Sequence, residues 1–124
     1  MLSSTTYQLI HILGILLVFM ALGGLSLHAM NGGTRDSNRA RVLVALTHGL
    51  GLLLILVAGF GMLARLGVMS GGLPGWVWVK VVVWLVLAAL IVVPYRKPGW
   101  SRALWFGMPV LGVIAAYSAL SRPL

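Results

Sequence analysis

Four long apolar segments, joined by short polar ones, make up almost all of this sequence. They run over residues 7–30, 42–66, 76–93 and 103–120. Each has roughly 18 to 25 residues, enough for a helix to cross the ~30 Å hydrocarbon core of a bilayer. Lipid offers the backbone no hydrogen-bond partners, so segments of this kind must be helical. We therefore predict an all-α integral membrane protein, with residues 1–124 forming a single transmembrane domain.

The composition agrees with lipid as the main solvent and excludes several kinds of chemistry. Only 8% of the residues are charged, whereas about a quarter are charged in soluble domains. Cysteine is absent, which excludes disulfides, iron–sulfur clusters and thiol catalysis. The single acidic residue, Asp36, lies in a loop. A proton relay through membrane carboxylates and a hard-metal site built on Asp and Glu are therefore also excluded.

Positive charge is concentrated in two of the three connections. The first and third loops hold six of the nine Lys and Arg residues, namely Arg35, Arg39, Arg41, Arg96, Lys97 and Arg102. The positive-inside rule places these loops in the cytoplasm and both termini, with Arg65 and Arg122, on the opposite side of a bacterial inner membrane. Because the basic loops face anionic lipid and no separate basic domain exists, we do not expect nucleic-acid binding.

Short loops make sequential helices antiparallel neighbours, which predicts an up-down-up-down four-helix bundle. Small residues indicate where the first two helices approach closely. They are Gly14, Gly23 and Gly24 in the first, and the pair Ala45 and Gly49, followed by Gly59 and Gly61, in the second. Helix packing is the favoured interpretation of these residues. The alternative is that the glycines leave a slot for a flat ligand between the two helices.

Ionisable side chains at membrane depth are costly, so each is a candidate functional residue. The four in this chain are His11, His28, His48 and Lys80. His11 and Lys80 each lie four residues into their segments from the outer end, which places both roughly 6 Å below the outer interface. Arg65 lies near the outer end of the second segment, at a similar level.

His11 and Lys80 have no membrane carboxylate to pair with. A haem would suit them, because its iron takes nitrogen ligands and its propionates attract Arg65. We predict that His11, Lys80 and Arg65 bind a haem b, with His11 and Lys80 as iron ligands. The alternatives are that Lys80 extends its flexible stem to the interface and that His11 bonds to the backbone of a neighbouring helix.

His28 and His48 lie nearer the cytoplasmic face. They are candidate axial ligands to a haem or another tetrapyrrole. The simpler alternative, which we favour, is that both stay hydrated close to the interface.

Several of these positions together resemble one family of membrane proteins. The first segment opens with Tyr7-Gln8-Leu9-Ile10-His11-Ile12-Leu13-Gly14 and closes on His28, and the third opens with Gly75-Trp76-Val77-Trp78-Val79-Lys80. This arrangement resembles the HemJ-type protoporphyrinogen IX oxidases and the related CopD-like and SirB-like small membrane proteins. The resemblance implies that His11 and Lys80 form a haem-associated pair. Trp78 stands where the family pattern has histidine.

Three functions compete on this basis. We favour an accessory or structural subunit of a larger respiratory or photosynthetic membrane complex, packed against other subunits or its own copies, with haem b or no cofactor. The alternative is a HemJ-like haem-dependent oxidase of protoporphyrinogen IX that passes electrons to quinone. Transport is the weakest, since four spans without an acidic residue leave little to couple an ion gradient to a substrate.

Overall fold

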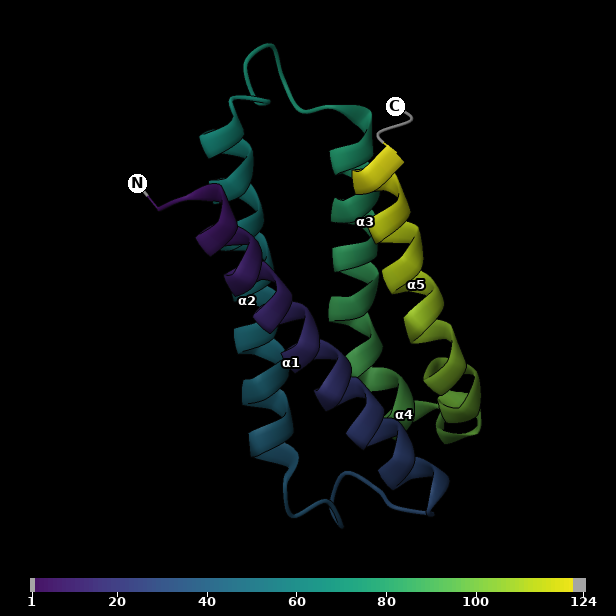
Figure 1. The fold of residues 1–124 in the computed structure, drawn as a ribbon. Coiled ribbons are helices and arrows are strands. Elements are labelled where there is room, and N and C mark those ends of the chain that lie inside the picture. Colours follow the sequence, from purple (N-terminus) through teal and green to yellow (C-terminus); the bar gives the residue numbers. More distant parts are fainter. Residues whose placement is uncertain (1, 122–124) are drawn as a thin grey trace.

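The computed structural model describes residues 2–121, which contain helices and no strands. The elements in chain order are α1 (Ser4–Met30), α2 (Arg41–Leu66), α3 (Gly75–Ala89), the 3-10 turn η1 (Leu90–Val92), α4 (Val93–Arg96), the 3-10 turn η2 (Pro98–Trp100) and α5 (Ser101–Ser121). Figure 1 shows the long helices running up and down, with the start of α1, the end of α5 and the α2–α3 connection at one end. The predicted all-α up-down bundle is confirmed.

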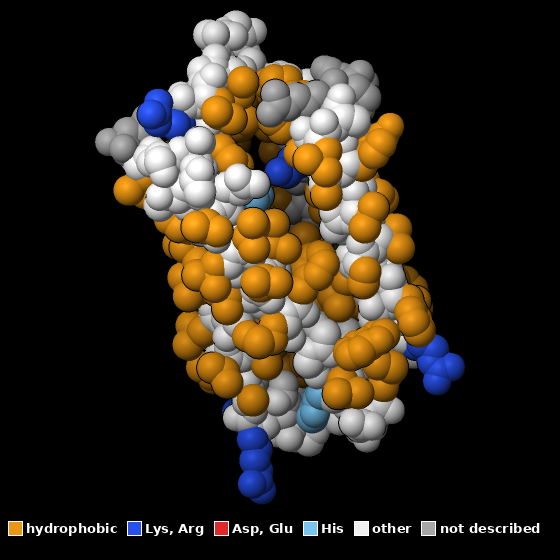
Figure 2. All heavy atoms as spheres, viewed as in Figure 1, with side chains coloured by type: hydrophobic (Ala, Val, Ile, Leu, Met, Phe, Trp, Pro, Cys, Tyr) orange, Lys and Arg blue, Asp and Glu red, His pale blue; other side chains and the backbone are white. Residues whose placement is uncertain are grey.

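The four spans are long and apolar enough to cross a membrane: Ser4–Met30, Arg41–Leu66, Gly75–Arg96 and Pro98–Ser121. Their outward-facing side chains are apolar, and Leu16, Leu46 and Phe106 are 61%, 67% and 68% exposed. Figure 2 shows apolar side chains spread over most of one face. Such a surface suits lipid or another membrane-embedded chain.

Two of the helix ends lie three residues away from the prediction, each for a local reason. α1 begins three residues earlier, because the Ser3 side chain caps it by accepting a hydrogen bond from the Thr6 N–H at 3.1 Å. The third span continues beyond Val93 to Arg96. Pro94 lies in the first turn of α4, where its missing N–H costs no helical hydrogen bond.

Helices α1 and α2 touch at a pair of glycines. A Cβ added to Gly14 would lie 2.7 Å from the Gly51 carbonyl oxygen, and one added to Gly51 would lie 2.7 Å from the Gly14 oxygen. Gly14 therefore serves helix packing, as predicted. Its counterpart is Gly51 rather than the pair Ala45 and Gly49, since nothing lies within 4 Å of a Cβ added to Gly49. Gly23 and Gly24 do not serve helix packing, since an added Cβ would meet only the Trp105 ring at 3.8 Å at the first and nothing within 4 Å at the second.

The buried apolar side chains form two separate clusters. The inner cluster joins α1, α3 and α5 through Val18, Leu22, Val83, Leu87, Leu104 and Met108. The outer cluster lies where α2 ends and α3 begins, and it contains Leu63, Trp76 and Val77. Helix α2 adds no fully buried residue to the inner cluster but packs on it through half-buried Leu52 and Ile55. The glycine contact and interhelical hydrogen bonds add to this packing.

The two predicted basic loops lie at the same end of the bundle, opposite the start of α1 (Figure 1). The Asn38 side-chain amide donates a hydrogen bond to the Tyr95 hydroxyl at 2.9 Å, and the Asn38 Oδ1 accepts from the Ala40 N–H at 3.0 Å. One buried amide thus links the loop before α2 to α4. Arg122, which the sequence places at the opposite end, lies outside the described residues.

The glycine contact predicts that Gly51→Ala destabilises the bundle and that Gly49→Ala does not. At Gly51 the new methyl group would meet the α1 backbone, and overpacking of this kind costs about 1–3 kcal/mol. At exposed Gly49 it would meet open space and add helix propensity. Thermal unfolding in detergent should show a midpoint several degrees lower for Gly51→Ala only. Equal midpoints for the two variants would contradict the contact.

Candidate functional site

A cavity of about 390 Å³ opens between α1, α2, α3 and the end of α5. Its wall is formed by 17 residues, and these include both members of the predicted outer pair, His11 and Lys80. The outer cluster borders it through Leu63, Trp76 and Val77. Figure 2 shows a hollow near the upper end of the visible face, with histidine and basic side chains inside it.

The His11 ring is fixed against α2. His11 is buried, and its Nδ1 lies 2.9 Å from the Ile55 carbonyl oxygen. A carbonyl can only accept, so Nδ1 carries the proton and donates it, and a neutral His11 then has a lone pair on Nε2. A Cβ at Gly59 would lie 3.3 Å from the His11 ring. Gly59 therefore makes room for the imidazole at the cavity wall.

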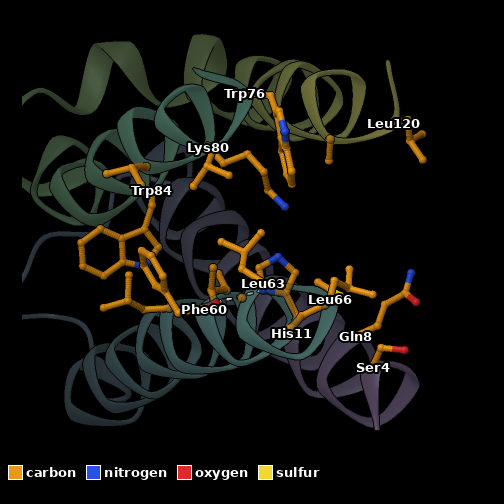
Figure 3. A pocket seen from close by; sticks show the side chains of 17 residues that line it. Ser4, Gln8, His11, Phe60, Leu63, Leu66, Trp76, Lys80, Trp84 and Leu120 are labelled. Atoms are coloured by element: carbon orange, nitrogen blue, oxygen red, sulfur yellow. Dashed lines mark hydrogen bonds between the residues drawn. The ribbon is translucent and has the colours of Figure 1, made fainter. Parts of the chain in front are cut away.

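The Lys80 side chain extends from α3 into the same cavity. Figure 3 shows its amine pointing toward His11. Within residues 2–121 the amine has no hydrogen-bond or salt-bridge partner, and the only acidic residue of the chain, Asp36, is in the α1–α2 loop. An amine at membrane depth without a partner is costly. The Lys80 amine is thus the one basic group in the cavity wall that lacks an anion or a hydrogen-bond acceptor among the described residues.

Aromatic residues complete the wall, and one of them, Trp84, was not among the predicted site residues. Trp84 lies one helical turn beyond Lys80, on the same face of α3. Its indole N–H donates to the Leu52 carbonyl oxygen at 3.0 Å, which ties α3 to α2. Trp76, near the start of α3, is buried and also lines the cavity. The four-residue spacing of Trp76, Lys80 and Trp84 was the available signal.

A second cavity of about 270 Å³ adjoins the first between α1, α3 and α5. The two share six lining residues: His11, Ile55, Lys80, Trp84, Ala119 and Leu120. His11 and Lys80 therefore lie at the junction of two spaces rather than at the end of one.

The structure does not bring the other predicted site residues into this group. Arg65 is in the last turn of α2 with an exposed side chain, and it is absent from the residues lining either cavity. His28 is half-buried at the end of α1, where its Nε2–H donates to the Thr34 carbonyl oxygen at 2.8 Å. His48 is buried, and its Nε2–H donates to the Leu87 carbonyl oxygen at 3.0 Å.

His28 and His48 thus each satisfy a backbone carbonyl in a different segment, and no described contact joins them. His28 holds the loop after α1, and the hydrogen bond from His48 links α2 to α3. Within residues 2–121 no group of three or more His, Cys, Asp or Glu side chains could enclose a metal ion. A metal bound here would therefore need ligands from elsewhere, as the iron of a haem has from its porphyrin.

Comparison of the chain with models of protein families, with characterised proteins and with solved structures found no match. The resemblance to the HemJ type therefore stays a prediction.

The hydrogen bonds predict opposite tautomers for the histidines. His11 should carry its proton on Nδ1, whereas His28 and His48 should carry theirs on Nε2, because in each case the bonded nitrogen faces a carbonyl acceptor. Nitrogen-15 chemical shifts of histidine-labelled protein would distinguish the tautomers, and single His→Gln variants would assign the signals. A proton on Nε2 of His11 would contradict the site geometry.

Proposed function

We propose that this chain is a small polytopic membrane protein that binds haem b or a related tetrapyrrole in the outer cavity. The observation that carries the proposal is the convergence of His11 and Lys80, from two different helices, on one cavity of about 390 Å³. Ligand sites in proteins usually have volumes of about 300–1,000 Å³ and a few convergent polar groups in an apolar wall.

The donor chemistry of the cavity fits a haem. An Nδ1–H to carbonyl hydrogen bond, such as that from His11 to Ile55, fixes the tautomer and orientation of a histidine that binds metal through Nε2. Lys80 supplies a second nitrogen, and Trp76 and Trp84 offer aromatic surface to a macrocycle. Ser4 and Gln8, rather than exposed Arg65, are the polar wall residues available to propionates. Bound haem would supply one-electron redox chemistry.

The protein would act as an accessory subunit of a larger membrane assembly, respiratory or photosynthetic. Support comes from its surface: the connections between helices are short, and α2 presents an exposed apolar face that includes Leu43, Leu46, Leu50 and Val57. Other subunits, copies of the same chain or lipid would cover this face. The alternative is a HemJ-like oxidase of protoporphyrinogen IX with quinone as electron acceptor, which the shared cavity of His11 and Lys80 favours.

Haem binding predicts a b-type signal in the reduced-minus-oxidised absorption spectrum of purified protein. His11→Ala and Lys80→Ala should each lose most of it, because each removes a nitrogen from the cavity. His28→Ala serves as the matched control and should keep it, since His28 bonds only to the α1–α2 loop. A folded wild-type protein without a haem signal, even after incubation with added haem, would exclude the proposal.

The enzymatic alternative has its own test. The wild-type chain should restore growth of a strain that lacks protoporphyrinogen oxidase, and His11→Ala should not. Absence of rescue by a wild-type protein that is expressed and binds haem would leave the accessory role.

We also propose that the basic end of the bundle faces the cytoplasm, in a bacterial inner membrane, because all six loop cations gather there. The chain has no cysteine, so single substitutions can report on topology directly. A membrane-impermeant maleimide should label Ser70→Cys in spheroplasts and should label Ser37→Cys only after lysis; both serines are exposed loop residues. The reverse pattern would invert the orientation.

A further inference from the structure

The second cavity is a groove that runs along the bundle from the His11–Lys80 junction toward the middle of the membrane. Its α1 wall consists of His11, Ile15 and Phe19, spaced four residues apart on one helix face, and its α5 wall includes Gly112 and Ala116 with the same spacing. The distance from His11 to Phe19 along α1 is about 12 Å. The groove therefore reaches well below the level of Lys80.

The groove and the larger cavity differ in chemistry. Apart from the shared His11, Lys80 and Trp84, the residues that line the groove are apolar, with one glycine, Gly112, among them. The larger cavity adds Ser4 and Gln8 at its outer end. A molecule bound across the junction would thus meet polar groups at one end and only apolar surface at the other, as an amphiphile requires.

The groove also opens sideways. Ala116 lines it and is exposed, as is Val113 one turn earlier on α5. That surface belongs to the apolar belt in which Val110, Val113 and Ile114 are exposed. In a bilayer the belt contacts acyl chains, so an acyl chain reaches the groove without crossing water.

The Lys80 amine indicates which head group a bound amphiphile would carry. The amine has no partner within residues 2–121, and no carboxylate of this chain lies in a membrane span. We infer that the junction binds a single-chain carboxylate amphiphile, such as a free fatty acid, with its carboxylate at Lys80 and its chain in the groove between α1 and α5. The groove of about 270 Å³ is smaller than the usual pocket for a drug-sized molecule, which favours one chain over the two of a phospholipid.

This inference rests on the ligand-binding role proposed for the cavity, but it does not require haem. A fatty acid would place its carboxylate near Lys80, and a haem would place its iron there. The two ligands would therefore compete for the same junction. Haem binding depends on the ring nitrogen of His11 and on the Lys80 amine, whereas fatty-acid binding depends on the charge of Lys80 and on free space beside Ala116 but not on His11. The two can therefore be separated by variant.

The test uses palmitic acid with a diazirine in its chain, added to the full-length protein in phosphatidylcholine nanodiscs, with adducts mapped by mass spectrometry after irradiation. We expect adducts to concentrate on groove residues such as Ile15, Phe19 and Ala116. Lys80→Gln should reduce these adducts about tenfold by removing the cation, and Ala116→Leu should do so by filling the groove. Ala103→Leu, the same change at an exposed α5 residue outside both cavities, should leave them unchanged.

The methyl ester of the same probe is the uncharged control and should label the outer helix faces without preference for the groove. Equal groove labelling by acid and ester would overturn the carboxylate assignment, and labelling by the acid spread over all lipid-facing residues would overturn the site. A diazirine phosphatidylglycerol that labelled the groove as well as the acid does would overturn the single-chain assignment. Absorption spectra of the same samples report separately on haem, so groove labelling without a haem signal would reject only the tetrapyrrole.

Discussion

The close approach of α1 and α2 at Gly14 and Gly51 sets the geometry of the site. Residues three or four apart share a helix face, so His11 lies one turn from Gly14 and Ile55 lies one turn from Gly51. The two backbones nearly touch at the glycines, and the imidazole one turn away is then within 2.9 Å of the Ile55 carbonyl oxygen. A larger residue at either glycine would separate the helices and lengthen this bond, with no direct contact to the cavity.

Most of the polar side chains between the helices form hydrogen bonds with helix carbonyl oxygens. Side-chain N–H groups of His11, His48 and Trp84 donate to carbonyl oxygens on neighbouring helices, where each acceptor has a second lone pair. Interhelical hydrogen bonds in membranes contribute on average about 0.6 kcal/mol each, so they orient the helices more than they stabilise them. Lys80 is different, because its charge needs an anion that the described helices do not supply. This contrast separates Lys80 from His11, His48 and Trp84, whose N–H groups find acceptors within the bundle.

The sequence was sufficient for the architecture, because the length and hydropathy of a span are properties of the segment itself. Counting residues from the outer interface also placed His11 and Lys80 at one level, and they share a cavity. Rotation of each helix about its axis was not predictable, since these helices are apolar on all sides and carry no face pattern. Neither the contact at Gly51 nor the place of Trp84 in the cavity wall could therefore be predicted. The same uncertainty in rotation applies to Arg65, which was predicted at the site and whose exposed side chain does not line the cavity.

The division of the apolar core has a consequence for how the molecule opens. The inner cluster joins three helices that are distant in sequence. The outer cluster is built chiefly from the end of α2, the connection after it and the start of α3, so most of its contacts are local in the chain. Local units of this kind open and close with a smaller free energy than the global unfolding of a protein. The cavity borders the outer cluster, so local opening of this cap would widen the cavity while the three-helix inner cluster stays packed.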